Sequence, residues 1–148
     1  MLDHLAAHLH CHTGTTTALL HTEASKAGGA AVGVDVSASI VSRAKALHPE
    51  PRFDVCDAWD VRGLLAVAAG RPIDLICVDV GGLSSAHGLL DTLALLRQLE
   101  ATFGVSPGSP QAQAAADDLP PLSIVMKSHC LRSLAMQMRS AHTVGPAA

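Results

Sequence analysis

Three aspartates and one lysine occupy equivalent places in this sequence, each at or near the end of a short apolar segment. They are Asp35, Asp57, Asp79 and Lys127. A carboxylate accepts two hydrogen bonds from a vicinal diol, such as that of a ribose, and a lysine beside a carboxylate can hold or move a proton. If the apolar segments are parallel strands, these residues meet at the sheet edge where ligands bind. The sequence therefore predicts a polar site for a nucleoside-like ligand.

The spacing around two of these acids supports that prediction. Gly14 lies about 20 residues before Asp35, which is typical of a glycine turn followed by an acid that binds ribose hydroxyls. Asp57, Ala58 and Trp59 suit an adenine, because a carboxylate accepts from the exocyclic amine, a backbone N–H reaches a ring nitrogen and an indole covers the ring. Packing in the core is the alternative role for Trp59, and any single aspartate at a strand end can serve only as a turn former or helix cap.

Histidines are dense near the start of the chain. His8, His10 and His12 alternate around Cys11, and imidazole and thiolate are zinc ligands. In a strand the three histidines would share one face, with Cys11 on the other, and no recognised zinc spacing is matched. We predict no metal site. The segment 81–88 holds Ser and His but no G-x-S-x-G motif, so a hydrolase is not favoured.

The composition limits the possible partners. The chain has 148 residues, of which 49% are hydrophobic and 16% charged, so we expect a single domain over 1–148. A net charge of -3 and 2% aromatic residues give no support for nucleic acid as a partner, although one delivered by another subunit stays open. No apolar run approaches the ~20 residues that cross a bilayer, and no signal peptide is evident. The four cysteines form no C-x-x-C pair, so we expect an intracellular, reducing compartment.

Short β-branched segments alternate with longer segments rich in Ala and Leu. Strands are predicted at 5–11, 30–36, 51–57, 72–82 and 122–128, and helices at 13–27, 37–48, 59–70, 86–104 and 130–140. This alternation is typical of an α/β fold with a parallel sheet covered by helices on both faces.

Several details follow from local patterns. Ser37 is expected to cap one helix and Gly70 to close another. The nearly continuous apolar run at 72–82 predicts a strand buried on both faces. Leucine spacing in the helix at 86–104 predicts a buried stripe of Leu89, Leu93, Leu96 and Leu99. The segment 104–121 is rich in Pro, Ala, Gly and Ser, which predicts a flexible insertion.

Five segments, taken in order, resemble the class I S-adenosylmethionine-dependent methyltransferases. They are CHTGTTTALL (11–20), VGVDVSASIVSRAKAL (32–47), FDVCDAWD (53–60), DLICVDVGG (74–82) and SIVMKS (123–128). The resemblance extends from about residue 6 to residue 135. It implies a Rossmann-like, three-layer α/β/α fold with strand order 3-2-1-4-5 and S-adenosyl-L-methionine bound over the first two strands.

The resemblance also assigns roles to individual residues. Cofactor binding falls to Cys11, His12, Gly14, Asp35, Val36, Asp57, Ala58 and Trp59. Asp79 marks the catalytic edge, and with Lys127 it resembles part of the Lys-Asp-Lys-Glu set of ribose 2′-O-methyltransferases, in which a lysine helps to deprotonate a hydroxyl. Neither the methyl acceptor nor the oligomeric state is indicated.

The sequence also departs from the family pattern. The first loop usually reads acid-x-Gly-x-Gly-x-Gly, whereas the matching positions here hold His8, His10, His12 and Gly14. Family members normally have two further strands, so we expect a shortened sheet. Two alternatives stay open: a non-catalytic or degenerate methyltransferase-like domain, and an NAD-binding Rossmann domain, for which Asp35 serves equally well but the G-x-G-x-x-G turn is missing.

Overall fold

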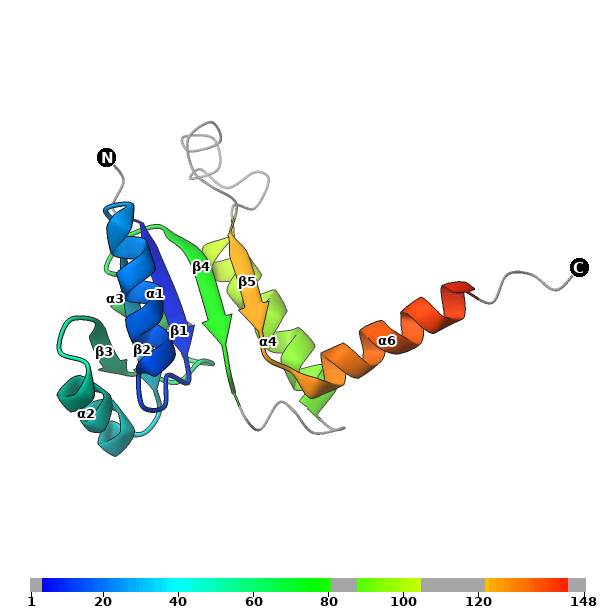
Figure 1. Ribbon diagram of the computed structural model, residues 1–148. Helices are drawn as coiled ribbons and strands as arrows, with labels where there is room; N and C mark the ends of the chain where they lie inside the picture. Colours follow the sequence, from blue (N-terminus) through cyan, green and yellow to red (C-terminus); the bar gives the residue numbers. More distant parts are fainter. Residues whose placement is uncertain (1–3, 81–87, 105–121, 144–148) are drawn as a thin grey trace, which may run out of the picture.

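The chain folds around a five-stranded parallel sheet with helices on both faces (Figure 1). The computed structural model describes residues 4–80, 88–104 and 122–143. Its elements are β1 (Leu5–Leu9), α1 (Thr15–Lys26), β2 (Ala30–Asp35), α2 (Ala38–Leu47), β3 (Arg52–Val55), α3 (Val61–Ala68), β4 (Ile73–Val78), α4 (Gly88–Phe103), β5 (Ser123–Met126) and α6 (His129–Thr143). The strand order is β3-β2-β1-β4-β5, and every neighbouring pair is parallel. The α/β class, the Rossmann-like architecture and the order 3-2-1-4-5 are therefore confirmed.

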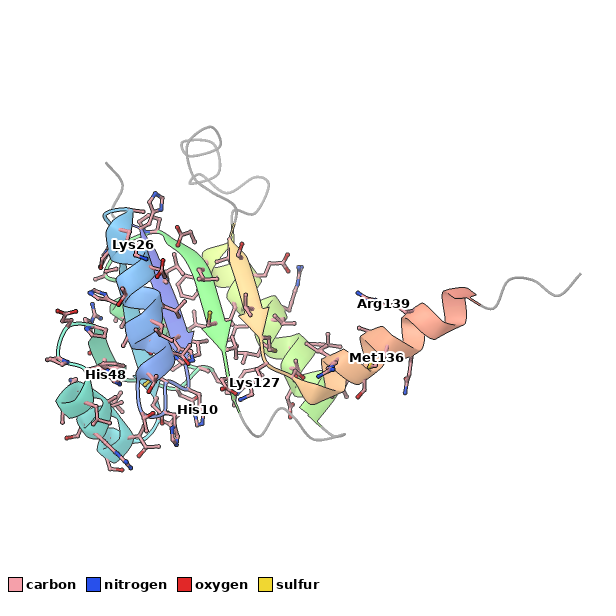
Figure 2. All side chains as sticks on the ribbon, viewed as in Figure 1. His10, Lys26, His48, Lys127, Met136 and Arg139 are labelled. Atoms are coloured by element: carbon pink, nitrogen blue, oxygen red, sulfur yellow. The ribbon has the colours of Figure 1, made fainter. Side chains whose placement is uncertain are left out.

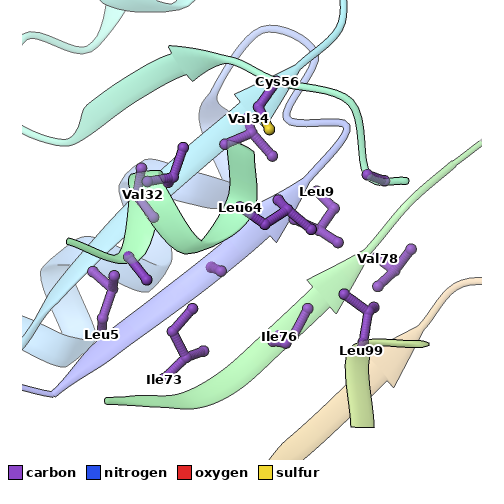
Figure 3. Close-up of a cluster of buried hydrophobic side chains, with 14 of the residues drawn as sticks. Leu5, Leu9, Val32, Val34, Cys56, Leu64, Ile73, Ile76, Val78 and Leu99 are labelled. Carbon is purple, nitrogen blue, oxygen red and sulfur yellow. The ribbon is translucent and has the colours of Figure 1, made fainter. Parts of the chain in front are cut away.

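The side chains of the central strand β1 point alternately to the two faces of the sheet. Leu5, Ala7 and Leu9 point to the face covered by α3 and α4, where they join the larger core cluster (Figure 3). Ala6 and His8 point to the face covered by α1. All five residues of β1 are buried because the strand is paired on both edges and covered on both faces.

A smaller apolar cluster joins the β1–α1 loop to helix α2 and the edge strand β3. Phe53 of β3 is 1% exposed and packs with Cys11, Val41 and Ala44. A Cβ atom at Gly14 would lie 2.7 Å from the Phe53 ring, so only glycine fits there. Gly14 also has a φ of 84°, a conformation that L side chains rarely adopt. The loop before α1 is therefore fixed by packing against β3.

Helix ends follow the predicted capping chemistry with small shifts. Ser37 caps α2 as predicted, since its hydroxyl accepts from a backbone N–H of the first turn. The helix predicted at 59–70 begins later, at Val61, because the carboxylate of Asp60 provides the N-cap. Its last helical residue is Ala68, and both Ala69 and Gly70 follow in left-handed conformations, with φ of 52° and 76°. Gly70 therefore closes the helix as predicted, directly after the C-cap residue Ala69.

The predicted stripe of α4 was right for Leu99, which is 1% exposed, but wrong for Leu93. The helix buries Thr92, Leu95 and Leu99, whereas Leu93, a member of the predicted stripe, is 44% exposed. Thr92 tolerates burial because its hydroxyl donates to the carbonyl of Gly88 at 2.6 Å. The helix has leucines on several sides, so leucine spacing alone did not fix which side faces the sheet.

The prediction that the strand at 72–82 is buried on both faces held for one face only. Ile76 and Val78 of β4 are 1% and 2% exposed beneath α3 and α4. Leu75 and Cys77 point to the opposite face and are only half-buried. In the described part of the chain α1 covers β1 and β2, but no helix covers β4 and β5 on that face (Figure 1).

Some predictions fall outside the described residues. The flexible insertion was expected at 104–121, of which residues 105–121 lie outside the described part. Of the Ser/His segment 81–88, residues 81–87 also lie outside it. Among the residues that are described, no helix is long and apolar enough to span a membrane.

The corrected phase of α4 gives a stability prediction. Leu95→Ala should lower the free energy of unfolding by about 2–5 kcal/mol, because Leu95 is fully buried. The matched change Leu93→Ala, in the same helix, should cost less than about 1 kcal/mol. Urea unfolding measures both. Equal losses would contradict the phase of this helix.

Candidate functional site

A cavity of about 360 Å³ lies at the carboxyl edge of the sheet, between the β1–α1 loop and the ends of β4 and β5. Figure 2 shows His10 and Lys127 at this edge. The lining residues are His8, His10, Cys11, His12, Thr13, Thr15, Thr16, Asp79 and Lys127. Of the predicted site residues, the cavity brings together Cys11, His12, Asp79 and Lys127, which come from three separate segments of the sequence.

The β1–α1 loop forms one wall of this cavity. The strand ends at Leu9, and His10 and His12 then adopt left-handed backbone conformations, with φ of 64° and 48°. Non-glycine residues pay roughly 1–2 kcal/mol for this conformation. The expectation that His8, His10 and His12 share one strand face was therefore wrong, because only His8 lies in the strand.

The carboxylate of Asp35 holds this loop in place. Its side chain is fully buried. One oxygen accepts from the backbone N–H of Ser37 at 3.0 Å, and the other accepts from the N–H of His12 at 3.3 Å. The Nδ1 atom of His10 lies 3.4 Å from that second oxygen. Asp35 does not line the cavity, whereas His10, which contacts its carboxylate, does.

The residues predicted for adenine lie beyond the third strand. Asp57 is exposed, and its carboxylate accepts from the backbone N–H of Trp59 at 3.0 Å. Trp59 is 41% exposed and Ala58 is buried, so the indole is not a core residue. Val36, at the start of the β2–α2 turn, is 60% exposed. None of these four residues lines the cavity.

An ion pair closes the opposite wall. The Lys127 ammonium donates to the Asp79 carboxylate at 2.9 Å, and their side chains are 77% and 42% exposed. Backbone hydrogen bonds fix both residues at adjacent strand ends, from Asp79 N–H to Leu9 and from Lys127 N–H to Val78. The pair presents an ammonium donor and a carboxylate acceptor to whatever enters the cavity.

The floor of the cavity includes a histidine that our sequence analysis did not assign to the site. His8 is 5% exposed, and its Nδ1 lies 2.9 Å from the Thr17 hydroxyl. Burial lowers the pKa of His8, and His10 lowers it further, while the Asp79 carboxylate opposes them. Alternate residues of a strand share a face, so His8 lies on the same face of β1 as Ala6, toward α1. This alternation was the sequence signal that could have placed His8 beneath the site.

The thiol in the loop is not activated. Burial and the neighbouring Asp35 carboxylate raise the pKa of Cys11 to about 11, so the group stays a thiol at neutral pH. Within the residues that the structure describes, no three His, Cys, Asp or Glu side chains gather in a way that would hold a metal ion.

Comparison with known proteins gives little. No family model matches the chain, and no curated protein matches it. Among solved structures, it is similar to a TehB-like SAM-dependent methyltransferase from Corynebacterium glutamicum, with 22% sequence identity and a TM-score of 0.44. The match covers 65% of this chain and 48% of that protein, so it spans about half of the neighbour's length.

The buried imidazole generates a pH prediction. Because the pKa of His8 is lowered below 6.5, the unfolded chain binds more protons than the folded chain between the lowered value and 6.5. We expect the free energy of unfolding to fall as the pH is lowered through this window. Urea unfolding at several pH values should show a weaker fall for His8→Gln. The matched change His48→Gln, after α2, should leave the slope unchanged, and equal slopes in both variants would contradict the assignment.

Proposed function

We propose that this chain is an S-adenosylmethionine-dependent methyltransferase domain. The observation that carries the proposal is the cavity at the carboxyl edge of a 3-2-1-4-5 sheet, with a glycine-initiated helix on one side and the Asp79–Lys127 pair on the other. In open parallel sheets this edge is where nucleotide-like ligands bind. The sequence resemblance supports the same assignment.

The residues present are compatible with the cofactor. A ribose diol can reach Asp35 by displacing one side chain, His10, because the other two donors to the carboxylate are backbone N–H groups that stay in place. His10 is 37% exposed, which leaves it room to move. Asp57 and the half-exposed indole of Trp59 would hold the adenine.

The methionine portion would lie in the cavity. Thr13, Thr15 and Thr16 supply hydroxyls there, beside the N-terminal turn of α1, and they would bind its carboxylate. His8 offers a mostly neutral imidazole where related proteins have an acid. It can accept a hydrogen bond from the amino group, but it provides no counter-charge.

When bound, the cofactor supplies a methyl group already attached to a good leaving group. The task of the protein is then to align the acceptor. The Asp79 carboxylate can accept a hydrogen bond from the acceptor's O–H or N–H, and the Lys127 ammonium can donate to an acceptor oxygen. Backbone hydrogen bonds hold both residues at adjacent strand ends, and their side chains pair at 2.9 Å, so the acceptor would meet both groups at the cavity mouth.

One observation favours a second candidate. The His10–Asp35 contact closes the site expected to bind ribose, as in a non-catalytic domain that has kept only the fold. The two candidates differ in whether a nucleoside displaces His10.

Calorimetry with S-adenosylhomocysteine tests the proposal. We expect binding by the chain, at least about 10-fold weaker binding by Asp35→Asn, and equal or tighter binding by His10→Ala, because the carboxylate is then open. Glu100→Gln, which removes a similar charge from α4, should bind like the parent chain.

NAD provides the control ligand. Binding of NAD in preference to S-adenosylhomocysteine would instead support a dinucleotide-binding domain. Failure to bind either ligand by both the parent chain and His10→Ala would contradict the proposal and support the non-catalytic alternative.

A further inference from the structure

A second cavity lies on the α1 face of the sheet, away from the site above. Its volume is about 440 Å³, and its lining is mostly apolar. It runs between the flank of α1, with Leu20, Ala24 and the C-cap residue Ala27, and the face of β4 and β5 that no described helix covers, with Leu75 and Ser123. We call it the α1–β4 groove.

The uncovered sheet face continues beyond the groove. Register places Cys77 beside Val125 and Leu75 beside Ser123 on this face. Val125 is 59% exposed. Parallel sheets are normally covered on both faces, and a helix lying next to α1 is the element that ordinarily provides the cover. The small side chains of Ala24 and Ala27 would let such a helix approach closely.

Helix α6 has the features of the missing cover, yet it points away from its own sheet (Figures 1 and 2). It has 15 residues, about 22 Å in length, which is close to the ~20 Å of the six-residue strand β4. Arg132, Met136 and Arg139 follow at i, i+4 and i+7, so they share one side, and all three are exposed. Met136 is 60% exposed.

The charges of the two surfaces are complementary. The sequence of α6 contains two arginines and no acid. The groove is bordered by the carboxylates of Glu23 and Asp74. Lys26 already donates to Glu23, at 2.7 and 2.8 Å, and His4 Nδ1 lies 3.3 Å from Asp74. Among the described residues no lysine or arginine forms an ion pair with Asp74, and an arginine of α6 would supply one.

The first turn of α6 is attached to the opposite side of its own sheet. The Cys130 thiol contacts the Thr92 hydroxyl of α4 at 3.8 Å and the Ser128 hydroxyl at 2.9 Å. Since α4 covers the other face, α6 would have to leave α4 to reach the groove of its own chain. A second copy can fill the groove with no such loss.

We propose that two copies of this chain associate reciprocally, with α6 of each lying in the α1–β4 groove of the other. Met136 then packs on Leu75 and Val125, and one of the two arginines approaches Asp74. This pairing is independent of the cofactor site, which lies at the carboxyl edge.

Light scattering on the full chain at about 100 µM tests the pairing, and the expected mass is twice 15.2 kDa. Val125→Glu and Met136→Glu should each weaken self-association at least about 10-fold. Val55→Glu, at the 55% exposed Val55 on the opposite edge strand, should leave it intact. Circular dichroism and thermal melting confirm that each variant is folded.

Mixing the two weakened variants gives the decisive result. In a heterodimer of Val125→Glu with Met136→Glu, one of the two contacts joins a normal groove to a normal α6, so the mixture should regain dimer that neither variant forms alone. A monomeric parent chain, which includes the case of α6 covering its own sheet, would overturn the proposal. So would a mixture that stays monomeric.

Discussion

The buried carboxylate of Asp35 organises the carboxyl edge of this protein. A charge removed from water must be hydrogen-bonded, and Asp35 meets this need with backbone N–H groups from two different loops. The bond from the His12 N–H ties the β1–α1 loop, with its left-handed residues His10 and His12, to the end of β2.

Apolar packing against Phe53 also holds the β1–α1 loop in place. Gly14 lies against the Phe53 ring, and Phe53 also packs on α2, so the loop, β3 and α2 form one unit. The position of the cavity wall therefore depends on residues from three separate segments. A ligand that takes the place of His10 on Asp35 would meet a loop whose backbone is already set, which is the preorganisation that a binding site needs.

Much of the fold was predictable because its signals are local. The alternation of β-branched and Ala/Leu-rich segments gave the elements, and Ser37 marked a helix start correctly. The failures involved information from outside each segment. Leucines on several sides of α4 left its phase open, and the half-exposed Leu75 depends on which helices cover β4. At the site, the predicted strand ends were enough to place Asp79 and Lys127 at the same edge of the sheet. No sequence pattern indicates a left-handed backbone at His10 and His12, so the contact between His10 and Asp35 was not predicted.

A crystal structure of the chain with S-adenosylhomocysteine tests the central claim most directly. The account predicts that the Asp35 carboxylate accepts both ribose hydroxyls, that the His10 side chain has left it, and that the bonds from His12 and Ser37 remain. If the ligand is bound elsewhere while His10 stays on Asp35, the account is contradicted.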